Sequence, residues 1–130
     1  MIFDTTFIVD VMRNEAAAVA KLHELISKGE PQLVTAVTIF ELFSGLARSK
    51  KPEQEKEGIR KVLYGQLIIH FDKEAAERAG DIDGTLIKEG TMIDPTDSMI
   101  AGIAVIKKEK LLTRNVKHFS RVRGLEIEVY

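Results

Sequence analysis

The fold is decided by the amino-terminal stretch, which reads Met1-Ile2-Phe3-Asp4-Thr5-Thr6-Phe7-Ile8-Val9-Asp10. Its three leading apolar residues predict a short strand, and the residues after Asp4 predict a helix over 5–12. Asp4 therefore stands where a strand ends and a helix begins. The rest of the chain repeats this alternation of short apolar strands with amphipathic helices, which is typical of βαβ units in a parallel sheet.

The remaining elements are predicted from the same periodicity. Strands are expected over residues 1–3, 32–35, 67–71, 111–113 and 127–129, and helices over 5–12, 16–27, 37–48, 73–89 and 96–107. Residues 49–57 are interpreted as a mobile loop or a helix start, and Gly80 and Gly84 weaken the longest helical pattern. With no internal repeat, we expect one α/β domain over residues 1–130, an open and mostly parallel sheet flanked by helices on both faces.

Composition limits the class of protein. The 130 residues are 45% hydrophobic and 30% charged, as in an ordinary soluble globular domain. Cysteine is absent, which excludes disulfides, thiolate catalysis and cysteine metal ligands. The first residues do not resemble a secretory signal, and the longest apolar run, Met99 to Ile106, is far shorter than the roughly 20 residues that span a bilayer. We expect a cytoplasmic protein without a membrane segment.

Charge is unevenly distributed although the net charge is only −1. Residues 107–123 hold seven basic side chains and a single acid, Glu109. One interpretation is that this segment neutralises nucleic-acid phosphates, and the other is that it forms a solvated face. Arg114 and Lys117 follow a predicted strand directly, so we expect these two side chains to bind phosphate, the arginine through two donors at once.

Four acids stand at predicted strand-to-helix junctions or in the helices that follow: Asp4, Glu41, Asp94 and Asp97. The carboxyl ends of parallel strands meet at one edge of a sheet, where ligands of open α/β proteins bind. Carboxylate oxygens are the ligands that Mg²⁺ prefers. This pattern favours a metal-dependent nuclease, and repulsion among the carboxylates predicts a raised pKa for at least one of them without metal.

Each acid also has a structural interpretation. Asp4 is suited to cap the helix that begins at Thr5, and Asp94 is suited to cap the helix of Pro95, with Asp97 in its first turn. Glu41 completes a capping box if Thr38 is the cap residue. If Thr35 is the cap, Glu41 lies in the second turn with no backbone donors. We favour Thr35, because the apolar pattern extends back to residue 36.

Four segments of the sequence resemble the signature motifs of PIN-domain ribonucleases. They are residues 1–10, residues 35–42 (Thr-Ala-Val-Thr-Ile-Phe-Glu-Leu), residues 94–101 (Asp-Pro-Thr-Asp-Ser-Met-Ile-Ala) and residues 112–119 (Leu-Thr-Arg-Asn-Val-Lys-His-Phe). They occur in the family's order and span nearly the whole chain. Within the family, the sequence is most similar to VapC-type toxins of toxin–antitoxin pairs.

The resemblance implies a PIN-like nuclease domain that cuts RNA with bound Mg²⁺ or Mn²⁺, leaving a 5′ phosphate and a 3′ hydroxyl. Asp4, Glu41 and Asp97 match the family's acidic positions and are the implied catalytic residues and metal ligands. Thr6 matches a hydroxyl that supports the first aspartate. The implied partners are an RNA substrate, a cognate antitoxin protein and a second copy of the chain in a homodimer.

The sequence departs from the family at its last motif. Many relatives carry an aspartate at the position of Asn115 or of His118. A three-acid site remains, and Asp94 or the amide oxygen of Asn115 is a further candidate ligand. The alternative is a weak or inactive PIN-fold module that binds RNA or protein. His118 is either a surface residue beside Phe119, which we favour, or a group that binds phosphate or assists proton transfer. His23 and His70 are interpreted as hydrogen-bonded or surface residues.

Two other classes fit the acidic pattern less well. A phosphorylated receiver domain and a haloacid-type phosphatase both need another acid close to the first aspartate, where this chain has Thr5-Thr6. The apolar residues around Phe40, Phe43 and Leu46 fit either a partner surface or the core, and the sequence leaves both open.

Overall fold

All five strands lie in one sheet, and every neighbouring pair is parallel. A computed structural model describes the complete chain, Met1–Tyr130. The strands are β1 (Ile2–Phe3), β2 (Leu33–Thr35), β3 (Leu67–Ile69), β4 (Leu111–Leu112) and β5 (Ile127–Glu128), in the order β3-β2-β1-β4-β5. Strand β1 pairs with both β2 and β4, so the chain changes direction across the sheet at its centre. Such a switch point is where open α/β sheets bind ligands.

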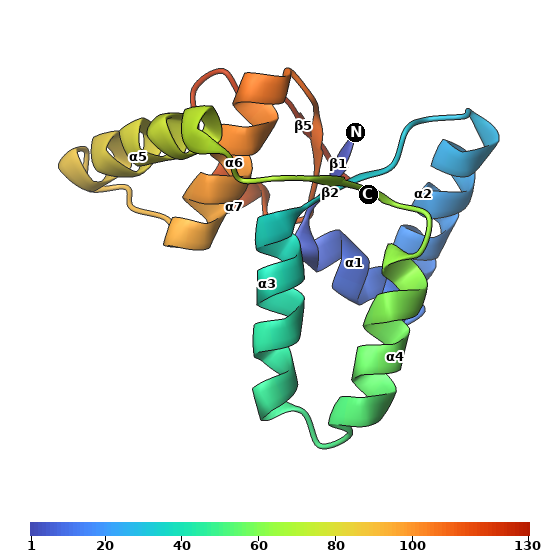
Figure 1. The fold of residues 1–130 in the computed structure, drawn as a ribbon. Helices are drawn as coiled ribbons and strands as arrows, with labels where there is room; N and C mark the ends of the chain where they lie inside the picture. Colours follow the sequence, from blue (N-terminus) through green and yellow to red (C-terminus); the bar gives the residue numbers. More distant parts are fainter.

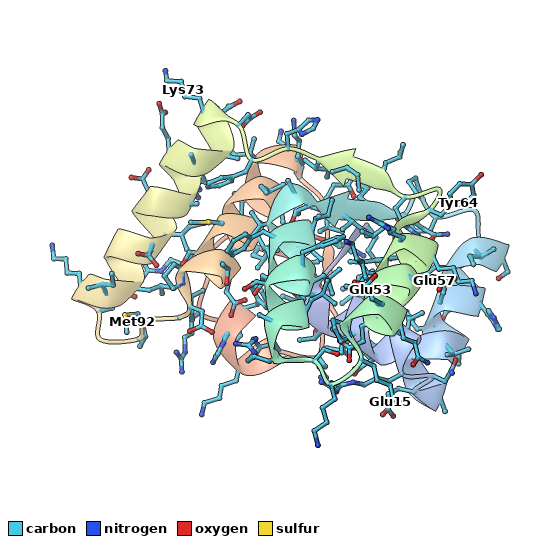
Figure 2. All side chains as sticks on the ribbon, turned by 60° about the horizontal axis from the view of Figure 1, so that its bottom comes forward. Glu15, Glu53, Glu57, Tyr64, Lys73 and Met92 are labelled. Carbon is cyan, nitrogen blue, oxygen red and sulfur yellow. The ribbon has the colours of Figure 1, made fainter.

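The helices connect the strands and cover the sheet (Figure 1). They are α1 (Thr5–Met12), α2 (Ala16–Ser27), α3 (Ala36–Gly45), the 3₁₀ turn η1 (Leu46–Arg48), α4 (Pro52–Leu63), α5 (Lys73–Lys88), α6 (Pro95–Lys107) and α7 (Val116–Phe119). Helix α3 stands between the α5–α6 pair and α4 (Figures 1 and 2). No helix combines the length and the apolar character that a membrane span requires.

Adjacent strand residues point to opposite faces and build two cores. Ile2 and Leu111 belong to one core with α5, α6 and α7, whereas Phe3 and Leu112 belong to the other with α1, α2 and α4. Both cores consist of buried aliphatic and aromatic side chains. The predicted α/β architecture, with helices on both faces, is confirmed, and the sheet is entirely parallel.

The structure resolves two points that the helical pattern left open and adds one short helix that was not predicted. The polar stretch 49–57 opens α4, which begins at Pro52 with acids in its first turn and bases in its last, a pattern that stabilises a helix through its dipole. Its exposed face carries Glu53 and Glu57 (Figure 2). Helix α5 continues through Gly80 and Gly84 without a break. Helix α7 is only four residues long and had no periodicity to predict it.

Helices α5 and α6 form the most extensive helix pair, and a glycine sets how closely they approach. A Cβ atom placed on Gly102 of α6 would lie 2.8 Å from the Cβ and from the backbone nitrogen of Ala79 in α5. Backbone atoms cannot move aside as the end of a flexible side chain can. The packing of α6, and with it the position of its amino terminus, therefore depends on glycine at this point.

We expect Gly102→Ala to lower the free energy of unfolding by about 1–3 kcal/mol, because the added methyl group overpacks the helix contact. Chemical denaturation monitored by circular dichroism measures the change. Gly84→Ala is the matched control, since a Cβ there meets nothing within 4 Å; it should stabilise α5 slightly. Equal stability of Gly102→Ala and the wild type would show that the contact between α5 and α6 accommodates the added methyl group without strain.

Candidate active site

The predicted site residues come together at the carboxyl-terminal edge of the sheet. Asp4 follows β1, and Thr113 to Asn115 follow β4. Helix α3 starts after β2 and carries Glu41, while the first turn of α6 carries Asp97. The parallel sheet thus delivers residues from four parts of the chain to one place.

Asp4 is a buried carboxylate held by hydroxyl groups. Only 2% of the residue is exposed, and its Oδ2 accepts hydrogen bonds from Thr113 Oγ1 at 2.7 Å and Thr6 Oγ1 at 2.8 Å. Asp4 occupies the N-cap position of α1 and makes no side-chain capping hydrogen bond of good geometry, although the backbone N–H groups of Thr5 and Thr6 lie close enough to lower its pKa. Burial raises its pKa, against the opposing effect of the two hydroxyls.

Thr113 is a site residue that the sequence interpretation missed. Its hydroxyl is fully buried and also accepts a hydrogen bond from the backbone N–H of Asn115. It fixes both Asp4 and the start of the loop after β4. The available signal was a polar residue at the end of an apolar strand, within the fourth motif.

Glu41 lies in the second turn of α3, as the favoured interpretation expected. Thr35 caps this helix by accepting from the N–H of Thr38 at 3.1 Å, which excludes the alternative capping box. The Glu41 carboxylate instead accepts from Thr5 Oγ1 of α1 at 2.6 Å and from Thr96 Oγ1 of α6 at 3.1 Å. Two threonines from separate helices therefore orient the carboxylate.

Asp97 is the second carboxylate of the site whose pKa is raised. Its residue is 8% exposed, and burial raises its pKa to about 6, aided by the nearby negative charges of Asp4 and Glu41. The hydrogen bond with His118 opposes this rise. A raised pKa for one of the acids was expected from the sequence. Asp4 and Glu41 are therefore close enough for their negative charges to act on Asp97.

His118 belongs to this cluster, which favours a role at the site over that of a plain surface residue. Its Nδ1 lies 3.1 Å from Asp97 Oδ2 and 3.0 Å from Asn115 Nδ2, and its side chain is 35% exposed. Helix α7 is the reason, because it turns the chain back toward α6 after β4. Asn115 also contacts Asp97, with its Nδ2 at 3.4 Å from Oδ2. His23 and His70 are exposed and lie outside the cluster.

The donor atoms fit a divalent cation. Asp94 is exposed at the start of α6 without a capping hydrogen bond, and its carboxylate joins Asp97 and His118 in a group whose ligand atoms lie within 4.8 Å of one another. Asp4 and Glu41 stand outside this closest group but within electrostatic reach of Asp97. Clustered acids with unfavourable mutual charge are what a bound cation stabilises.

The basic segment 107–123 is divided by the fold. Lys107, Lys108 and Lys110 precede β4 and so lie toward the opposite edge of the sheet. Arg121 donates to the backbone carbonyls of Thr91 and Met92, and Arg123 pairs with Glu89 at 2.8 Å, so both tie the α7 region to the connection after α5. Met92, which is labelled in Figure 2, lies in that connection. The segment as a whole is therefore not a continuous phosphate-binding face.

Arg114 and Lys117 are the basic residues of the segment at the carboxyl edge. Arg114 has 54% of its side chain exposed and forms an ion pair with Asp10 at 2.9 Å. Lys117 is exposed on α7. Phe43 of α3 and Leu46 of η1 pack against the core, whereas Phe40 of α3 is 63% exposed beside Glu41.

Comparison with known proteins agrees with the resemblance of the motifs. The PIN domain family matches residues 1–125. The chain is 30% identical over 125 residues to the tRNA(fMet)-specific endonuclease VapC of Shigella flexneri, covering 96% of this chain and 93% of that protein. It is also 30% identical to ribonuclease VapC19 of Mycobacterium tuberculosis, over 96% of each chain.

A solved structure extends the similarity to the whole fold. VapBC2 from Rickettsia felis, crystallised with a DNA fragment from their promoter, aligns with a TM-score of 0.89 and 26% identity. The alignment covers 100% of this chain and 99% of that chain. The chain therefore belongs to the PIN-domain family and, within it, to the VapC type.

Proposed function

We propose that the chain is a divalent-metal-dependent endoribonuclease and the toxin of a toxin–antitoxin pair. The observation that carries this proposal is the convergence of Asp4, Glu41 and Asp97, with the pKa of Asp97 raised to about 6 by burial and by the other two acids. Its VapC relatives are named ribonucleases. The substrate class is RNA, and the bond cut is an internal phosphodiester.

Asp4, Glu41 and Asp97 would hold Mg²⁺ or Mn²⁺, with Asp94 and Asn115 as further ligands. A cation held there would supply Lewis-acid assistance to the phosphodiester and activation of the attacking water. Five threonine hydroxyls fix or support the carboxylates before RNA arrives: Thr5, Thr6, Thr38, Thr96 and Thr113. Such preorganisation limits the structural change needed during the reaction. Thr6 supports Asp4 through its 2.8 Å hydrogen bond.

Arg114 and Lys117 would hold RNA phosphates beside the carboxylates. Both follow β4 and are exposed, and their positive charges offset the repulsion between the acidic cluster and the RNA backbone. A guanidinium can bind two phosphate oxygens at once. The chain has a net charge of −1, so its affinity for RNA would come from this local arrangement rather than from overall charge.

His118 gives the site a nitrogen donor where many relatives have a carboxylate. We expect His118→Asp to shift cleavage toward Mg²⁺, because Mg²⁺ prefers oxygen whereas a transition-metal ion such as Mn²⁺ accepts imidazole readily. The ratio of the Mn²⁺-supported rate to the Mg²⁺-supported rate should fall by about tenfold. His23→Asp on the exposed face of α2 is the control. An unchanged ratio would exclude His118 from the metal environment.

The proposed partners are a cognate antitoxin and a second copy of the chain, in a cytoplasmic homodimer. Similarity to the VapBC2 complex supports the antitoxin. Phe40 is a candidate contact residue for the antitoxin, since it is 63% exposed next to Glu41. A partner that buries this aromatic ring would lie beside the site.

The departures at Asn115 and His118 favour one other candidate function, a PIN-fold module that binds RNA without cutting it.

An RNA cleavage assay distinguishes the two functions. Purified protein is incubated with transfer RNA, ribosomal RNA and unstructured RNA in Mg²⁺, Mn²⁺ or EDTA, and the ends of the products are mapped. The nuclease proposal expects metal-dependent internal cuts that leave 5′ phosphates. Binding without cutting on every RNA, by a protein that is folded by circular dichroism, would favour the inactive module.

A further inference from the structure

Asp10 is a buried carboxylate outside the acidic cluster, and the proposed mechanism does not use it. It lies in α1, and only 2% of the residue is exposed. A buried charge is costly unless partners satisfy it. The partners of Asp10 therefore indicate why an acid is kept at this position.

Both partners of Asp10 come from the last part of the chain. Its Oδ2 accepts a hydrogen bond from the Tyr130 hydroxyl at 2.7 Å and lies 2.9 Å from Nη1 of Arg114. The Tyr130 ring packs edge-on against Phe7, with centroids 4.9 Å apart. Thr6, whose hydroxyl binds Asp4, also lies against the Tyr130 phenol. The arrangement is continuous with the acidic site through Thr6.

The ion pair leaves most of the Arg114 guanidinium available. Arginine has five N–H donors in a rigid plane, and Asp10 engages the end nitrogen Nη1. The side chain remains 54% exposed. Its neighbours in sequence, Thr113 and Asn115, contact Asp4 and Asp97 respectively, so the backbone of Arg114 is fixed at the site.

We propose that Asp10 and Tyr130 are positioning residues that hold Arg114 so that its free N–H donors face an RNA phosphate beside the acidic cluster. This inference rests on the proposed function, because it takes RNA as the ligand. Asp10 fixes the guanidinium through charge, and Tyr130 fixes Asp10 through its hydroxyl. Neither residue touches the substrate.

A purely structural ion pair makes different predictions. Asp10→Asn removes a negative charge, and on long-range electrostatics alone this change strengthens binding to a polyanion. The positioning role predicts weaker RNA binding for Asp10→Asn. Without Asp10, the Arg114 side chain is no longer held in one orientation, so it loses more conformational entropy when it binds phosphate. The positioning role also requires that Asp10 act through Arg114.

Binding of a fluorescein-labelled RNA hairpin in EDTA, measured by anisotropy, tests the inference without requiring cleavage. The full chain is compared with Asp10→Asn, Arg114→Gln and the double variant. We expect about tenfold weaker binding for Arg114→Gln, severalfold weaker binding for Asp10→Asn, and no further loss in the double variant. Lys73→Gln, an exposed charge change at the start of α5 (Figure 2), should have little effect.

The inference would be overturned if Asp10→Asn binds RNA as tightly as the wild type or more tightly, or if the losses in affinity multiply in the double variant. Failure of the wild type to bind RNA would overturn it as well. If Asp10→Asn does not fold, Tyr130→Phe takes its place, since it keeps the ring contact with Phe7 and removes only the hydroxyl. Binding that follows the expected pattern without any cleavage would contradict the nuclease function and leave the positioning role supported.

Discussion

Asp97→Asn is expected to abolish RNA cleavage and, in the absence of metal, to stabilise the protein. The carboxylate of Asp97 is buried near Asp4 and Glu41, and these effects raise its pKa to about 6. At pH 7.5 it is ionised despite that cost. An amide of the same size removes the cost of burying the charge and the repulsion from the neighbouring acids, so the free energy of unfolding in EDTA should rise by about 1–2 kcal/mol. Cleavage should fall by about a thousandfold or more, because a metal ligand is lost.

Thermal denaturation in EDTA and single-turnover cleavage in Mn²⁺, both at pH 7.5, measure the two effects on the same samples. Asp81→Asn is the control, because this acid is exposed on α5 away from the cluster. A less stable Asp97→Asn protein would mean that the hydrogen bonds of the Asp97 carboxylate stabilise the metal-free fold by more than its burial and repulsion destabilise it. Retained cleavage would remove Asp97 from the active site.

The second large effect concerns pH. The folded-state pKa of Asp97, about 6, lies above its ordinary value of 3.8, and that of Asp4 is raised as well. Protonation therefore stabilises the metal-free fold fully below the ordinary value, and this contribution is lost as pH rises through about 6. A cation competes with these protons, so its affinity should fall as pH drops below 6, by up to about tenfold per pH unit for one proton.

Melting temperatures with Mn²⁺ and with EDTA at pH 7.5 and pH 5 test this linkage. We expect Mn²⁺ to raise the melting temperature clearly at pH 7.5 and much less at pH 5. In Asp97→Asn, the shift should be small at both pH values. An Mn²⁺ shift of equal size at pH 5 and pH 7.5 in the wild type would show that the cation does not bind to the Asp97 cluster.

The sheet and the placement of its acids were predictable from local pattern. Alternation of apolar strands with helices implies parallel pairing, and parallel pairing brings the end of β1 and the end of β4 to one edge. That reasoning placed Asp4 and Asn115 together. Glu41 followed from a local signal, the Thr35 cap, which fixes the helical turn on which the carboxylate lies.

Contacts between distant side chains were not predictable in the same way. The hydroxyls of Thr5, Thr96 and Thr113 reach the carboxylates only through the packing of α1, α6 and β4. His118 enters the site because of α7, which is too short to show helical periodicity. The Asp10 and Arg114 pair likewise depends on how α1 sits against the end of β4, and neither residue signals it locally.

The most direct test of the metal-dependent nuclease account is the rate of RNA cleavage as a function of Mn²⁺ concentration, for the wild type and Asp97→Asn on the same RNA. The account predicts a rate that rises and saturates with Mn²⁺ in the wild type, is abolished by EDTA, and stays negligible in Asp97→Asn at every concentration. Cleavage by the wild type in EDTA, or by Asp97→Asn at the wild-type rate, would contradict it.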